Sequence, residues 1–153
     1  MGKLYSALFL AALVVASRAE LAWQTNFEAA KQQAKKEDKV VLVDFTGSDW
    51  CGYCIRLKKA VWDKPEFAKF AEKSLVLVEL DFPHNKKLPA DLKKQNDKLQ
   101  DKYHIEGFPT IVLLDGDGKE LGRMEGYEGD NVDSYIKRLE KIIATKSPAK
   151  AKS

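Results

Sequence analysis

The segment of residues 40–54, VVLVDFTGSDWCGYC, constrains the fold of this chain more than any other. It opens with a β-branched run, residues 40–45, whose apolar side chains do not alternate with polar ones. That pattern is typical of a strand covered on both faces, in the middle of a sheet flanked by helices. Cys51 and Cys54 follow after a short loop, where a helix is predicted to begin. The segment therefore predicts a buried strand that delivers two thiols to the start of a helix.

The remaining hydrophobic patterns predict alternating helices and strands. Five long apolar patterns have helical or buried-strand spacing, and the sequence DGDG between two short apolar runs predicts a hairpin turn. This order predicts an α/β fold with a central mixed β-sheet flanked by helices on both faces. The predicted elements are a helix over 25–37 with a capping box of Thr25 and Glu28, a strand over 40–45, a helix from 51 that ends or kinks near Pro65, a strand over 75–80, a helix over 90–103, hairpin strands over 111–114 and 120–127, and a helix that Asn131 caps.

The first residues resemble a secretory signal peptide. Lys3 precedes an apolar run over residues 4–15, and the small residues of Ser-Arg-Ala follow at 17–19. This pattern predicts a signal peptide over residues 1–19, cleaved before Glu20, and a periplasmic or secreted protein without stable membrane association. An uncleaved anchor is the alternative, although the run is shorter than the roughly 20 apolar residues that span a bilayer.

Composition limits the remaining classes. A 153-residue chain with 44% hydrophobic residues can bury one core, so we expect a single domain over residues 20–145 and a disordered Lys-rich tail over 146–153. Lys and Arg number 26 against 23 Asp and Glu, a net charge of +3 that does not suggest nucleic acid as a partner. No dimerisation element is evident, and we expect a monomer.

The spacing of the two cysteines assigns each a role. A sulfur at Cys51 would lie beside the free N–H groups and the positive dipole end of the predicted helix, which stabilise a thiolate. Cys54, one turn later, could attack a mixed disulfide at Cys51. A purely structural disulfide is the first alternative, but closing a four-residue loop contributes only roughly 2 kcal/mol. A zinc site is the second, with only His84 and His104 to complete the ligands, so no metal is expected.

These residues resemble the thioredoxin superfamily. The segment of residues 40–54 is similar to the family's strand, loop and active-site helix, which ends in Trp-Cys-Gly-X-Cys, and GFPT at residues 107–110 is similar to its Gly-X-Pro-Thr segment. The resemblance covers roughly residues 25–145 and implies a thioredoxin-like fold. It also implies a cis peptide bond at Pro109, with the backbone of Phe108 open to an extended substrate segment. A trans proline at a strand start is the alternative.

The family further implies a substrate groove and a proton acceptor. Trp50 and Tyr53, next to the cysteines, would shape the groove together with Phe108 and Pro109. A carboxylate within an apolar strand is costly, and in the family the acid that matches Asp44 lies beneath the disulfide and moves the proton of the second cysteine. We expect this role, and a raised pKa, for Asp44; an aspartate at a strand edge that reaches water is the alternative.

Three departures from the family pattern limit what the resemblance implies. Asp44 and Cys51 are one residue further apart than in ordinary thioredoxins, and the stretch over residues 81–103 is longer. Glu79 stands where those proteins have a lysine, so the proton path from Asp44 is not defined by the resemblance.

The sequence thus predicts an extracytoplasmic thiol-disulfide oxidoreductase with the redox pair Cys51 and Cys54. Its substrates would be protein thiols and disulfides, and an unidentified redox protein would be its partner. No organic cofactor is needed, because the cysteine pair carries both electrons. Reductase, oxidase and isomerase all use such a site; reductase is slightly favoured because isomerases usually need a dimerisation element. A redox-inert peptide-binding module with a structural disulfide is the alternative from another class.

Overall fold

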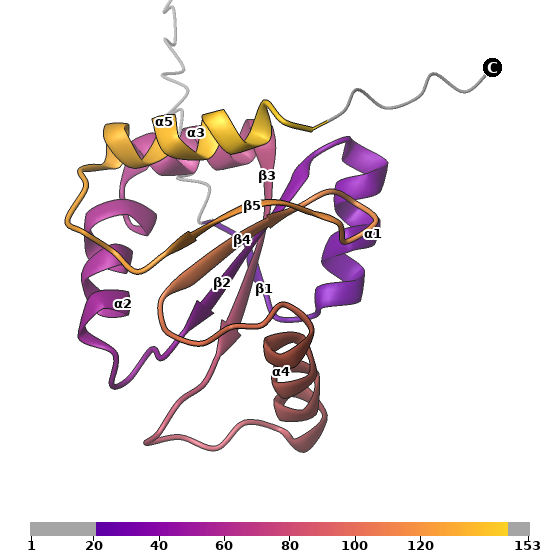
Figure 1. Ribbon diagram of the computed structural model, residues 1–153, viewed down its shortest axis with the longest axis vertical. Coiled ribbons are helices and arrows are strands. Elements are labelled where there is room, and N and C mark those ends of the chain that lie inside the picture. The colour runs from indigo at the N-terminus through magenta and orange to yellow at the C-terminus, as the bar shows by residue number, and fades with distance from the viewer. Residues whose placement is uncertain (1–20, 147–153) are drawn as a thin grey trace, which may run out of the picture.

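The computed structural model describes residues 21–146, which form a five-stranded sheet with helices on both faces (Figure 1). The strand order is β1-β3-β2-β4-β5, with β2 parallel to β3 and antiparallel to β4. The predicted fold class, a mixed sheet flanked by helices, is confirmed. In chain order the elements are β1 (Trp23–Gln24), α1 (Phe27–Glu37), β2 (Val40–Thr46), α2 (Gly52–Leu57), the π-helix η1 (Lys58–Trp62), α3 (Pro65–Ser74), β3 (Leu75–Asp81), α4 (Ala90–Lys102), β4 (Thr110–Leu114), β5 (Glu120–Glu125) and α5 (Val132–Ile143).

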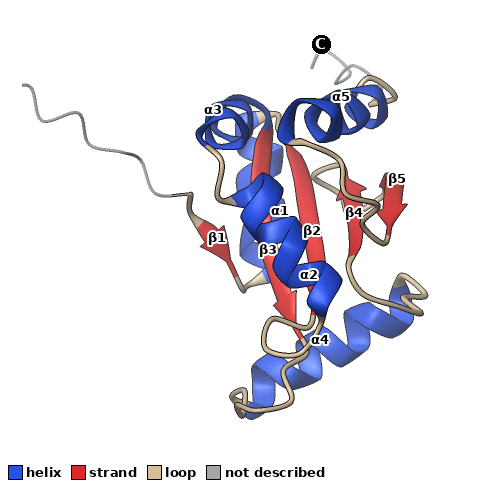
Figure 2. Cartoon of the chain, turned by 90° about the vertical axis from the view of Figure 1, so that its left-hand side faces the viewer, coloured by secondary structure: helices blue, strands red, loops and turns tan. Residues whose placement is uncertain are grey.

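Two hydrophobic cores lie on opposite faces of the sheet. Helices α1 and α4 cover one face, while α2, α3 and α5 cover the other (Figures 1 and 2). The π-helix η1 packs in the same core as α2, α3 and α5. Every residue of β2 is buried, which confirms the prediction of a strand covered on both faces. Because β2 pairs with β3 on one side and with β4 on the other, the loop at its carboxyl end starts from a fixed position in the middle of the sheet.

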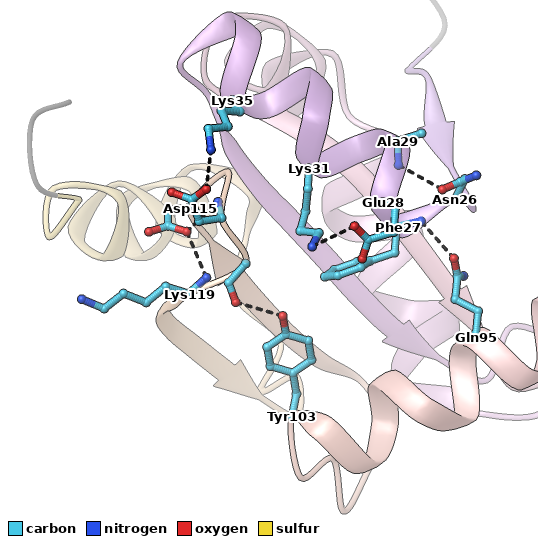
Figure 3. Close-up of polar contacts among 12 residues, drawn as sticks. Asn26, Phe27, Glu28, Ala29, Lys31, Lys35, Gln95, Tyr103, Asp115 and Lys119 are labelled. Carbon is cyan, nitrogen blue, oxygen red and sulfur yellow. Dashed lines mark hydrogen bonds and ion pairs between the residues drawn. The ribbon is translucent and has the colours of Figure 1, made fainter. Parts of the chain in front are cut away.

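The start of α1 differs from the prediction. Asn26, not Thr25, is the N-cap: its side-chain oxygen accepts the backbone N–H of Ala29 at 3.0 Å (Figure 3). Glu28 pairs instead with Lys31. The strand β1, only two residues long, was not predicted, since so short an edge strand has no pattern to detect.

The long segment between β3 and β4 is fixed by α4 and its contacts. The side chain of Gln95 accepts the backbone N–H of Phe27 at 3.1 Å, and the hydroxyl of Tyr103 donates to the carbonyl of Gly118 at 3.0 Å (Figure 3). These bonds join α4 to the start of α1 and to the hairpin turn. Residues 90–103 were predicted to be helical, and α4 ends one residue earlier.

Three other features of the structure add detail to the predicted pattern. The helix that follows the cysteines continues through the π-helix η1 and stops before Pro65, which begins α3. In the hairpin turn Gly118 has a φ of 84°, a left-handed conformation that glycine adopts without strain. Strand β5 ends at Glu125, two residues before the predicted end, and Gly126 follows with a φ of 71°.

The ends of the chain leave two predictions open. The signal peptide over residues 1–19 lies outside the described residues, as does the tail over residues 146–153 apart from its first residue. Between residues 21 and 146, no helix is both long and apolar enough to cross a bilayer.

The start of α5 provides a test of a predicted helix cap. Asn131 accepts the backbone N–H of Ser134 at 2.9 Å, as predicted for a cap. Replacing it, Asn131→Ala, is expected to lower the free energy of unfolding by about 1 kcal/mol, because that N–H loses its partner. Urea unfolding measures the loss. Asn131→Ser keeps a capping oxygen, so its free energy of unfolding should fall much less. Equal losses in the two variants would contradict the assignment of Asn131 as the N-cap.

Candidate active site

The two cysteines form a disulfide at the N-terminus of α2. Cys51 is the N-cap residue, and its sulfur accepts the backbone N–H of Cys54 at 3.2 Å. The side chains are nearly covered, with 6% of Cys51 and 4% of Cys54 exposed, so exposure alone does not distinguish them. Position does. Only the sulfur of Cys51 lies at the end of the helix where free N–H groups and the helix dipole favour a negative charge.

The loop before the cysteines is tied to the end of the neighbouring strand. Both carboxylate oxygens of Asp81 bind Ser48, one accepting its backbone N–H at 2.9 Å and the other its hydroxyl at 2.6 Å. The backbone N–H of Cys51 donates to the carbonyl of Gly47 at 2.9 Å. A Cβ atom at Gly47 would lie 2.5 Å from the indole of Trp50, so only glycine allows the ring to pack there. The loop is thus held at both ends.

Trp50 is the most strongly fixed of the predicted groove residues. Its indole N–H donates to the carbonyl of Phe82 at 2.8 Å, and its ring stacks on His84 with centroids 4.3 Å apart. The ring of Phe108 meets it edge-on at 5.9 Å. Even so, 42% of Trp50 remains exposed. An exposed, immobilised aromatic surface therefore adjoins the disulfide.

The peptide bond between Phe108 and Pro109 is cis, which confirms that prediction and excludes the trans alternative. The ring of Phe108 stacks on Phe82 at 5.1 Å and so joins the Trp50 cluster. Tyr53 does not belong to this cluster. It lies on α2 with 56% of its surface exposed, and its ring faces the guanidinium of Arg56 at 4.3 Å.

Asp44 lies in the central strand and is buried, so the alternative of an aspartate at a strand edge is wrong. By strand alternation its side chain shares a face with Leu42, which packs in the core beneath α2 and η1. One carboxylate oxygen accepts the indole N–H of Trp62 at 2.9 Å, and the other is without a hydrogen-bond partner among the described residues. The carboxyl group thus lies on the cysteine helix's side of the sheet.

Burial raises the pKa of Asp44 from 3.8 to about 7, even though the bond from Trp62 opposes the rise. The charges of Glu79 and Asp81 raise it further. Glu79 is the register partner of Asp44 on β3, and its own pKa is raised, first by burial and then by Asp81. Two neighbouring acids therefore replace the acid and lysine of ordinary thioredoxins, and at neutral pH Asp44 can both hold and release a proton.

Sequence reasoning missed several members of the site. Trp62 lies within the predicted helix after the cysteines, and that place could have suggested its contact with Asp44 on β2. His84 was considered only as a metal ligand, and no local pattern indicates its stacking on Trp50. The predicted strand stops at residue 80, whereas Asp81 ends β3 and holds Ser48. In the part of the chain that the structure describes, no three His, Cys, Asp or Glu side chains gather as metal ligands.

Paired sulfurs at a helix N-terminus, with a buried carboxyl group of raised pKa on the central strand, suit thiol-disulfide exchange. The sheet order and the cis-proline after α4 place this site in the thioredoxin fold. The fold and the site together define a redox protein of the thioredoxin fold.

Comparisons with known proteins agree with that class. The family model of the thioredoxin-like domain matches residues 27–143. The disulfide bond reductase DsbH of Chlamydia pneumoniae is 34% identical over 125 residues, which cover 82% of this chain and 74% of that protein. A solved structure of a DsbH oxidoreductase superposes with a TM-score of 0.79 at 31% identity, covering 92% of this chain and 96% of that one. A thioredoxin from Thermus thermophilus shares the fold, with a TM-score of 0.61 at 22% identity, covering 80% of this chain and 86% of that one. The chain belongs to the thioredoxin-like family and is a thiol-disulfide oxidoreductase.

The raised pKa of Asp44 predicts how stability depends on pH. Because the folded state holds the proton more tightly than the unfolded state, Asp44 favours folding fully below pH 3.8, and this contribution is lost as the pH rises to about 7. The loss corresponds to about 4 kcal/mol at most. The asparagine of Asp44→Asn cannot ionise. The free energy of unfolding of this variant, minus that of the wild type, should therefore increase between pH 4 and 7.

Urea unfolding of the oxidised proteins at several pH values tests this. Asp101→Asn, which changes an exposed aspartate, is the control and should follow the wild type. A constant difference between Asp44→Asn and the wild type across the whole range would contradict the assigned titration.

Proposed function

We propose that this protein is an extracytoplasmic reductase of protein disulfides, with Cys51 as the nucleophile and Cys54 as the resolving thiol. The observation that supports it most is the place of the Cys51 sulfur at the N-terminus of α2, where it accepts the N–H of Cys54. That position lowers the cost of a thiolate at Cys51 and gives Cys54 no such help.

The proposed reaction has two exchanges. The thiolate of Cys51 attacks one sulfur of a substrate disulfide; the substrate S–S bond breaks, and its other sulfur leaves as a thiolate that takes up a proton. A mixed disulfide joins Cys51 to the substrate. Cys54 then loses its proton and attacks the Cys51 sulfur, which forms the Cys51–Cys54 disulfide and releases the second substrate thiolate. The substrate gains two electrons, and the protein is left as the disulfide.

Asp44 is the proposed acceptor of the Cys54 proton. It lies on the same side of the sheet as α2, and a pKa of about 7 allows a carboxylate that can accept a proton at neutral pH. Glu79, half-buried and in register with Asp44, is the group through which that proton would pass to solvent.

The direction of disulfide exchange and the location of the protein are supported by separate arguments. DsbH, a relative at 34% identity, is named a disulfide bond reductase, which favours the same direction here. An extracytoplasmic location is supported by the signal-like pattern of residues 1–19. A reductase outside the cytoplasm needs a dithiol partner protein to restore its own thiols, because each turnover leaves it oxidised. No second class of function is favoured by an observation on the site.

Trapping tests the two cysteine roles. Reduced Cys54→Ser should form a stable mixed disulfide with a disulfide-containing protein, because nothing resolves it, whereas Cys51→Ser should form at least tenfold less. Mass spectrometry and non-reducing electrophoresis detect the adduct. Equal trapping by the two variants, or preferential trapping through Cys54, would overturn the assignment.

Asp44→Asn tests the proton acceptor. The release of substrate from the mixed disulfide should slow by tenfold or more at neutral pH, because loss of a general base typically costs 10²–10⁴-fold and water replaces part of it. The first attack by Cys51 should change little. Rapid-quench kinetics with acid trapping separates the two steps. An unchanged release rate from pH 6 to 9 would remove Asp44 from the mechanism.

A further inference from the structure

A groove of about 550 Å³ adjoins the active site, between the loop that follows β3 and helix α4. Trp50 and Phe108 form its wall on the active-site side. The other apolar lining residues come from the loop after β3 and the start of α4; they are Phe82, Pro83, Leu88 and Ala90. The groove is therefore built from the segment between β3 and α4, from α4 itself, and from the aromatic cluster beside the disulfide.

The walls of the groove are fixed by several contacts. Phe82 stacks on Phe108 and accepts the indole N–H of Trp50. The carboxylate of Asp49 accepts the backbone N–H groups of His84 and Asn85 at 2.9 and 2.8 Å, which sets the course of the loop. A ligand that enters this groove meets a preformed surface and orders little of the protein on binding.

The rim of the groove is basic. Three lysines and two aspartates line it, which leaves one positive charge in excess. Lys86 pairs with Asp81 at 2.9 Å and Lys93 with Asp97 at 2.6 Å. Lys87 is exposed and has no ion pair among the described residues, so it carries the charge that a ligand can meet.

We infer that this groove binds the segment of a substrate protein beside its disulfide, and that it selects a large apolar side chain next to an acidic one. The apolar side chain would lie against Phe82, Leu88 and Phe108, and the acid would pair with Lys87. Trp50 connects the two sites because it lines the groove and directly precedes Cys51. An extended chain advances roughly 3.3 Å per residue, so a segment only a few residues from the substrate cysteine can reach.

This inference rests on the proposed function, and its test is arranged to separate the two. The substrates are disulfide-linked dimers of short peptides in which Leu-Glu, Leu-Gln, Leu-Lys or Ser-Glu stands near the cysteine. The second-order rate constant for their reduction by the fully reduced protein is measured by stopped-flow fluorescence. Bis(2-hydroxyethyl) disulfide, small and uncharged, serves as a substrate that needs no groove.

The wild type should reduce the Leu-Glu peptide about five- to tenfold faster than the Leu-Lys and Ser-Glu peptides, with Leu-Gln between them. Lys87→Glu should reverse the order of Leu-Glu and Leu-Lys, and Leu88→Ser should remove most of the preference for leucine over serine. Lys94→Glu makes the same charge change at an exposed position of α4 that does not line the groove, and it should keep the wild-type order.

Equal rates for all peptides, or the same reversal in Lys94→Glu as in Lys87→Glu, would overturn the inference. The first result means that the groove is not used, and the second that only the overall charge matters. Reduction of bis(2-hydroxyethyl) disulfide should be unchanged in every variant. If the wild type fails to reduce even that compound, it is the proposed function that fails.

Discussion

The active site depends on one contact, the hydrogen bond from the backbone N–H of Cys54 to the sulfur of Cys51. The contact exists because β2 ends in the centre of the sheet and a short loop leads from it into α2, so that Cys51 takes the N-cap position. A sulfur in that place receives the N–H groups and the dipole of the helix before any other residue contributes. The tie between Ser48 and Asp81 keeps the loop, and hence the sulfur, at the end of the strand.

The second constraint is the carboxyl group that the central strand buries. With an apolar side chain at position 44 the folded protein would be more stable above neutral pH, because the wild type must either protonate Asp44 or bury its charge. Trp62 offsets part of this cost by donating its indole N–H, while Glu79 and Asp81 add to it. Such a destabilising arrangement is typical of groups that serve chemistry, and Asp44 lies on the side of the sheet where the cysteine helix packs.

Local patterns were enough to predict most of the fold. The non-alternating runs of β2 and β3, the cap of α5 at Asn131 and the hairpin turn each follow from a few neighbouring residues. The two-residue strand β1 and the π-helix η1 could not be predicted, because they depend on packing against distant elements. The same holds within the site. The cysteine pair and Pro109 belong to sequence motifs, whereas the stacking of His84 on Trp50 and the bond from Trp62 to Asp44 arise only when separate elements meet.

The pKa of the Cys51 thiol in the reduced protein tests the central claim most directly. The rate of alkylation by iodoacetamide, followed from pH 4 to 10 in the wild type and in Cys54→Ser, reports the thiolate of Cys51. A helix N-terminus should hold this pKa clearly below the ordinary cysteine value of about 8.5, so that rapid alkylation persists at neutral pH. A thiol that titrates at or above that value would contradict the account.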